Sequence, residues 1–113
     1  MSHPIRYIDV IPNSDTARAN SPFNVLGGLI NDAKETITLP VTLWGKAEAD
    51  WQPIVTQNVE IQPGEHKHIY YTIPRESMRP AFWHTDELEE LELLTHHNPP
   101  AGNAKGILIF VEP

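Results

Sequence analysis

Short segments in which apolar and polar residues alternate dominate the chain, and they predict β-strands rather than helices. In 35–44 every second residue is apolar, and these residues share one face: Ile37, Leu39, Val41 and Leu43. The opposite face is mostly threonine. In 66–73 the same alternation places Ile69, Tyr71 and Ile73 toward a core, with Lys67 at its rim. The two segments therefore define a buried face and an outer face for two strands.

Five further segments are predicted to be strands from their β-branched content and flanking turn residues: 4–11, 22–30, 51–61, about 90–97 and 105–111. Segment 105–111 is apolar on both faces, which predicts a central strand. Segment 12–21 has no apolar face and is expected to be a loop.

Glycine and proline mark specific places within and between these segments. Gly27-Gly28 inside 22–30 predicts a bulge or a close backbone approach, and Pro40 predicts a sheet edge or a bulge. Pro63-Gly64 has the signature of a type II turn.

The stretch from Pro74 to about residue 97 allows more than one interpretation. One helical turn fits 75–79, and 81–84 fits a short strand or a loop that covers an opening in the core. Leucines spaced by three within 85–97 favour a helix, whereas alternation near its end favours a strand. We therefore expect a helical turn near 86–89 and a strand from about 90 to 97.

The sum is about seven strands spaced some 10–15 residues apart, with at most one or two helical turns near 75–90. That pattern is typical of an all-β antiparallel sandwich. The 113 residues form a single predicted domain, 1–113. Forty per cent apolar content is enough for a packed core.

The stretch 59–74, in which an apolar strand end leads through Pro-Gly-Glu into an alternating strand, resembles a pattern of prokaryotic immunoglobulin-like domains. The earlier segment 37–43 is similar to a core strand of those domains. The resemblance covers about a third of the chain and implies an immunoglobulin-like sandwich. Such folds serve as adhesins, linkers, sugar-binding modules and assembly subunits, so the resemblance implies architecture only.

Charge and composition exclude several function classes. Fifteen acidic and eight basic residues give a formal charge of −7, which disfavours nucleic acid and anionic membranes as partners. The absence of cysteine excludes disulfides, a thiol nucleophile and cysteine-ligated metals. The N-terminal residues 1–6 lack an apolar signal segment, so a cytoplasmic location is expected. No cofactor motif is present.

Histidines supply one candidate site. His66 and His68 lie on one face of the predicted strand 66–73, close enough to share a metal ion, and His84 is a candidate third ligand. His96 and His97 are further candidates if the fold brings them near. The arrangement invites comparison with cupins, although the glycine spacing differs. A solvated strand face beside a turn is the favoured alternative.

Aromatic residues supply another candidate site: Trp44, Trp51, Trp83 and Phe82. Exposed indoles stack on sugar rings or anchor protein interfaces. The favoured alternative is that at least two of the tryptophans close the ends of a small sandwich. The acidic stretch 86–92 is interpreted as a solvated face that promotes solubility or protects a sheet edge.

These patterns favour a non-catalytic interaction or structural module, which is not an enzyme and needs no cofactor. A protein partner or self-association is expected, because a sandwich with exposed edges and spare apolar surface tends to find a partner. Two alternatives stay open. One is a carbohydrate-binding module that uses the tryptophans, and the other is a cupin-like metal-binding protein that uses His66 and His68.

Overall fold

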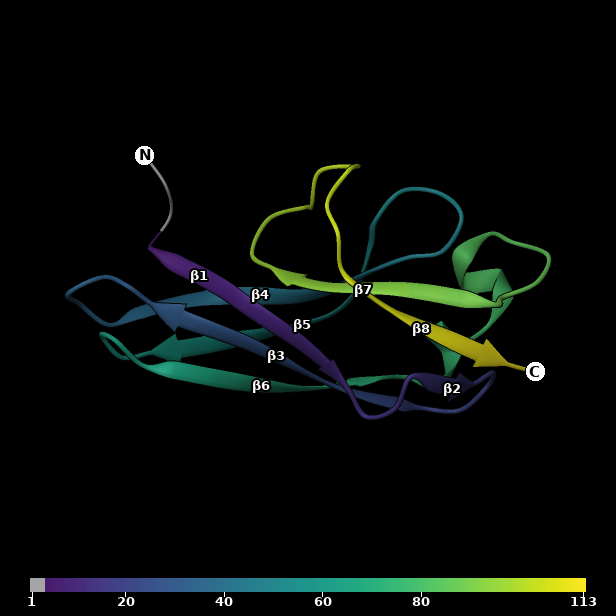
Figure 1. Ribbon diagram of the computed structural model, residues 1–113, viewed down its shortest axis with the longest axis horizontal. Helices are drawn as coiled ribbons and strands as arrows, with labels where there is room; N and C mark the ends of the chain where they lie inside the picture. The colour runs from purple at the N-terminus through teal and green to yellow at the C-terminus, as the bar shows by residue number, and fades with distance from the viewer. Residues whose placement is uncertain (1–3) are drawn as a thin grey trace.

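The computed structural model describes residues 4–113, which form eight β-strands and two short 3-10 turns (Figure 1). The expectation about a signal segment rests partly on residues 1–3, which lie outside this range. The elements are β1 (Ile5–Pro12), β2 (Thr16–Arg18), β3 (Phe23–Asn31), β4 (Ile37–Lys46), β5 (Gln52–Ile61), β6 (His66–Ile73), η1 (Arg75–Ser77), η2 (Pro80–Trp83), β7 (Glu90–His96) and β8 (Ile107–Glu112). No helix in the described part of the chain is long and apolar enough to span a membrane.

The strands form two sheets, and the predicted all-β fold is confirmed. One sheet has the order β1-β3-β6 and the other β2-β8-β7-β4-β5. All neighbouring pairs are antiparallel except β2 and β8, which run parallel. The strands run along a molecule of 47 × 24 × 19 Å, with β1 beginning near one end and β8 ending at the other (Figure 1).

The inner faces of the two sheets form one core, as the alternation in the sequence predicts. Val41 and Leu43 of β4 face Tyr71 and Ile73 of β6, and all four side chains are fully buried. Lys67 lies half-buried at the rim of this face. The partly exposed outer faces of both sheets are therefore available for function.

The glycine and proline that mark a turn and a sheet edge also behave as the sequence predicts. Gly64 has a φ of 73°, and the N–H of Glu65 donates to the carbonyl of Gln62, which are features of a type II turn. Pro40 pairs only with β5, because β7 pairs with β4 from Thr42 onward. Its missing N–H therefore falls where the sheet has a local edge.

Three expectations about secondary structure are wrong. The loop predicted over 12–21 contains β2, which is three residues long and too short for an alternating pattern to show. The helical turn predicted near 86–89 is irregular, because Leu88 is buried against the core while five carboxylates crowd 86–92. The segment 81–84 is not a strand, because η2 occupies most of it.

The prediction that 105–111 forms a central strand is confirmed, because β8 lies between β2 and β7, but its outer face is not buried. β8 pairs with β7 through Ile107–Phe110, but β2 covers only the far end of its other edge. Its outer face is open to solvent, so its apolar residues on that face are exposed.

Asn31 joins the two sheets at one end of the molecule. Its buried side-chain amide donates to the carbonyls of Glu35 (2.8 Å) and Ile61 (2.9 Å), and its oxygen accepts from the N–H of Ala33 (2.8 Å). Ile61 ends β5 in the opposite sheet. One side chain therefore satisfies the backbone of one turn and of a strand end.

Replacing Asn31 by alanine is expected to lower the free energy of unfolding by about 3 kcal/mol, since it leaves buried carbonyls without donors. Urea unfolding followed by circular dichroism measures the change. Asn58→Ala, on the exposed part of β5, is the matched control and is expected to cost less than about 0.5 kcal/mol. Equal unfolding midpoints for the two variants would contradict the role given to Asn31.

Candidate functional site

The outer face of β8 exposes two large apolar side chains. Leu108 is 47% exposed and Phe110 is 53% exposed, and both point away from the core because their neighbours Ile109 and Val111 are buried. Exposed apolar surface that is bordered by polar residues can mark an interaction site. We call Leu108 and Phe110 the β8 patch.

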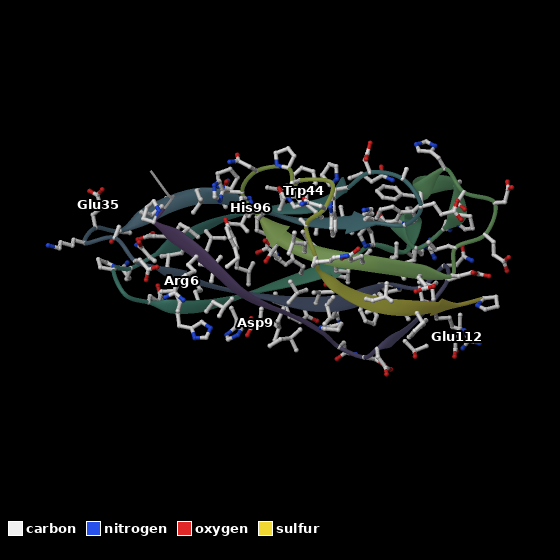
Figure 2. The ribbon with its side chains drawn as sticks, turned by 45° about the horizontal axis from the view of Figure 1, so that its top comes forward. Arg6, Asp9, Glu35, Trp44, His96 and Glu112 are labelled. Carbon is white, nitrogen blue, oxygen red and sulfur yellow. The ribbon has the colours of Figure 1, made fainter. Side chains whose placement is uncertain are left out.

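Carboxylates border the β8 patch along β7 and at the end of β8, whereas Thr16 and the exposed Arg18 of β2 lie along its other edge. Glu92 lies directly opposite Leu108 on β7, and Glu90 lies directly opposite Phe110. Glu112 follows Phe110 on the same face of β8 and lies toward one end of the molecule (Figure 2). Directly opposed residues of an antiparallel pair have Cβ atoms about 5 Å apart, so the acids border the apolar pair.

Two hollows flank the β8 patch. The hollow beside Leu108, of about 220 Å³, is bordered by Glu87, Glu89 and Lys46. The hollow beside Phe110, of about 540 Å³, has Leu88 and Pro80 in its wall. The patch therefore combines apolar contact area with recesses that can receive side chains of a partner.

The predicted histidine pair lies on the three-stranded sheet, on the side of the sandwich opposite to the β8 patch. His66 and His68 share the exposed face of β6, with ring centroids 4.7 Å apart. His84 follows η2 at the other end of the molecule, so the structure does not bring it to this pair (Figure 1). His96 and His97 stack on each other with centroids 4.4 Å apart, and both contact Tyr7 instead.

The tryptophans do not form one exposed platform. Trp83 is only 3% exposed, and its indole N–H donates to the carbonyl of Ser77 (2.7 Å). Its ring occupies the space beside Gly45, where a Cβ would approach it to 2.5 Å. The expectation that Trp83 is an exposed ligand contact is therefore wrong, since this ring closes one end of the core.

Trp44 and Trp51 are each half-buried on the five-stranded sheet. The indole N–H of Trp44 on β4 donates to the carbonyl of His96 on the neighbouring strand β7 (3.2 Å), and Figure 2 labels the two residues near each other. The Lys46 ammonium lies 5.9 Å from the centre of the Trp51 ring. Phe82 is half-buried and packs edge-on against Trp83. These aromatic rings mainly serve the packing of the fold.

Tyr7 ties the edge strand β1 to the opposite sheet. Its hydroxyl lies 2.7 Å from Nδ1 of His97. Burial raises the pKa of Tyr7 to about 12, although a hydrogen bond with the His97 backbone opposes the rise. Burial also raises the pKa of Tyr71, whose hydroxyl donates to the carbonyl of Val41 (2.7 Å). Both phenols therefore favour their neutral form in the folded protein.

Of the residues that carry these surfaces, the sequence singles out His66 and His68 but not Asp9 or the β8 patch. The β8 patch was hidden because an apolar segment was interpreted as a fully buried strand. Asp9 was hidden because it lies 59 positions before His68, although the two side chains approach each other across β3. The signal for that approach was Gly27-Gly28, which predicts close packing over a strand, and both glycines are in such contacts.

No protein-family model matches this chain, and none of the curated proteins matches it. Solved structures do. One similar structure is a β-glucosidase from Erythrobacter marinus, with a TM-score of 0.71 and 13% identity over 96% of this chain and 15% of that chain. Another is a β-glucosidase involved in saponin metabolism from intestinal bacteria, with a TM-score of 0.74 and 17% identity over 96% and 16%.

A third similar structure is an alkylpurine DNA glycosylase from Pseudomonas fluorescens bound to DNA containing an abasic site analog. Its TM-score is 0.65, with 9% identity over 100% of this chain and 32% of that chain. The chain thus spans about one sixth of the β-glucosidases that it matches and about one third of the DNA glycosylase. At these identities the likeness shows a shared fold.

The Tyr7 phenol makes stability sensitive to alkaline pH. An unfolded phenol loses its proton near pH 10, whereas the pKa of Tyr7 is about 12, so stability is complete below pH 10 and falls as pH rises toward 12. Tyr7→Phe is expected to remove roughly 1 kcal/mol of the fall between pH 9 and 11.5, after allowance for solvent screening. Urea midpoints at several pH values measure it, with pH 7–9 as the flat reference. An identical alkaline fall in both proteins would exclude this source.

Proposed function

We propose that this chain is a non-catalytic interaction module that binds a basic protein surface through the β8 patch. The observation that carries the proposal is the exposure of Phe110 and Leu108 beside a row of carboxylates on β7. Aromatic side chains at the centre of an interface often supply most of its binding energy. A polar border around such a centre is typical of protein interfaces.

Charge determines the chemistry of the partner. Glu90, Glu92 and Glu112 border the patch, and the whole chain has a formal charge of −7. A partner with an apolar centre and a surrounding set of lysines or arginines would complement both properties. Opposite charges at the border speed association and select against other surfaces.

Self-association through the same patch is less favourable. Two copies docked face to face would place the acidic borders of both molecules against each other, and like charges at an interface cost several kcal/mol. The β8 patch therefore supports a heterologous partner over the self-association expected from the sequence.

Comparison with the solved structures is compatible with a module that works beside other domains. In the β-glucosidases the matched segment makes up only about one sixth of the chain, so the fold accompanies a much larger remainder there. We carry over from those proteins only the idea of an accessory domain, and not their activity.

We further propose that the sandwich is immunoglobulin-like. Its β1-β3-β6 sheet and the order β8-β7-β4 correspond to the A-B-E and G-F-C strands of that fold. The additional strand β5 lies beside β4, where the variable-type domains also add a strand. Strand order supports this assignment more directly than the sequence resemblance does.

The first test places a photo-crosslinking amino acid at position 110 in cells of the source organism. A discrete adduct with another protein is expected, its crosslinked surface should be rich in lysine and arginine, and charge reversal of Glu90 and Glu112 to lysine should remove it. The same crosslinker at position 72, on the exposed face of β6, is the control and should not give this adduct. Adducts identical at both positions, or only with a second copy of the chain, would exclude the proposed partner.

The second test measures affinity with the purified partner by calorimetry. Phe110→Ser is expected to weaken binding at least tenfold, because it removes the central apolar contact. Thr72→Ser serves as the matched surface variant, and raising the salt concentration should weaken binding further. Light scattering of the free chain is expected to give a monomer. Unchanged affinity for Phe110→Ser would exclude the β8 patch as the docking surface.

A further inference from the structure

The outer face of the three-stranded sheet carries a cluster that the β8 patch does not involve. It lies on the opposite side of the sandwich and consists of Asp9 on β1 with His66 and His68 on β6. One ligand atom from each side chain can be chosen so that all three lie within 4.8 Å of one another. Three residues of metal-binding type from two strands therefore converge on one point.

A glycine in the strand between them allows this convergence. Gly28 of β3 pairs with Asp9 on one side and with His68 on the other, so the three residues form one row across the sheet. A Cβ on Gly28 would overlap the Asp9 carboxylate, coming 2.9 Å from its Cγ, and would lie 3.3 Å from Nε2 of His68. The absence of a side chain at Gly28 leaves the space in which the acid and the imidazole meet.

A β-bulge directs Asp9 into that space. The pairing of β1 with β3 shifts between Tyr7 and Asp9, so Ile8 is an extra residue with no partner. Side chains alternate along a strand, and the extra residue places Asp9 on the outer face with Arg6. Figure 2 shows both residues along the same long side of the molecule. Bulges of this kind re-aim side chains at functional sites.

One oxygen of the Asp9 carboxylate lacks a hydrogen-bond donor among residues 4–113. Its Oδ1 atom is covered from solvent and accepts no hydrogen bond within residues 4–113, although the side chain as a whole is 39% exposed. The nearest cationic candidate is Nε2 of His68 at 3.7 Å, beyond hydrogen-bond length. A covered carboxylate oxygen without a donor is unfavourable. A cation bound between Asp9 and the imidazoles would satisfy it.

We propose that Asp9, His66 and His68 form a binding site for a divalent transition-metal ion of the zinc class. Two imidazole nitrogens and one carboxylate oxygen form a donor set that suits zinc and its first-row neighbours. Calcium and magnesium prefer sites built from oxygen alone. Tetrahedral zinc with these donors needs ligand atoms about 3.3 Å apart, so the exposed histidines close on the ion by rotating about their side-chain bonds.

An ion at this site would link the two edge strands of the three-stranded sheet. β1 and β6 are the two edge strands of the three-stranded sheet, and β3 lies between them. An ion held by Asp9 and His68 links the two edges above Gly28. Three protein ligands leave one coordination position open to solvent, so an outside donor can complete the site.

Isothermal titration calorimetry with zinc sulfate tests the site on the full chain, purified without a histidine tag and freed of metal by a chelator. One zinc ion per chain is expected, together with a raised melting temperature. His68→Ala and Asp9→Asn are each expected to weaken zinc binding at least tenfold. The control is His84→Asn, which removes an exposed imidazole at the other end of the molecule. Asparagine tolerates the left-handed backbone at position 84 (φ 55°), so this variant should bind zinc like the unmodified chain.

The variant Gly28→Ala distinguishes a site with three ligands from zinc binding by the two surface histidines alone. This variant keeps all three ligands but displaces the Asp9 carboxylate, so a loss of at least tenfold is expected while circular dichroism confirms folding. Zinc binding that survives both Asp9→Asn and Gly28→Ala would reduce the site to an adventitious histidine pair and overturn the proposal. Equal losses in His84→Asn and His68→Ala would overturn it as well.

Discussion

Two buried hydrogen bonds between the sheets determine how this sandwich is held together. The Tyr71 hydroxyl of β6 donates to the Val41 carbonyl of β4, and the Asn31 amide of β3 donates to the Ile61 carbonyl of β5. Hydrophobic burial brings two sheets together without fixing their relative position, whereas a buried donor must meet its acceptor. In a chain without cysteine, these bonds fix the alignment of the inner faces and hence the residues that each outer face presents.

The outer faces of the two sheets differ in chemistry, and in each sheet an uncovered or missing side-chain position explains the difference. The face of the five-stranded sheet is apolar and acidic at β8, because no further layer of the described residues packs over Leu108 and Phe110. The face of the three-stranded sheet gathers imidazoles and a carboxylate, because Gly28 has no side chain to separate them. The two proposals therefore concern surfaces that face away from each other and can operate independently.

The fold could be predicted largely from sequence, whereas the candidate sites could be predicted only in part: His66 and His68 are recognisable, but Asp9 and the β8 patch are not. Alternation in β4 and β6 reveals their inner faces because burial acts on every second residue of a strand. The same reasoning fails for β8, since an apolar outer face looks identical in sequence whether another packed layer covers it or solvent does. Asp9 depends on strand pairing over long sequence separations, which no local pattern records.

The extra residue Ile8 has a consequence for how this strand can change over evolution. Because Ile8 has no partner, its deletion would leave Tyr7 opposite Leu29 and Asp9 opposite Gly28, so both halves of β1 would keep the faces that they present now. Deleting a paired residue of β1 would instead turn the strand over on one side of the deletion, so that outward side chains would point inward and inward ones outward. Ile8 is therefore the position at which β1 can lose one residue without exchanging its two surfaces.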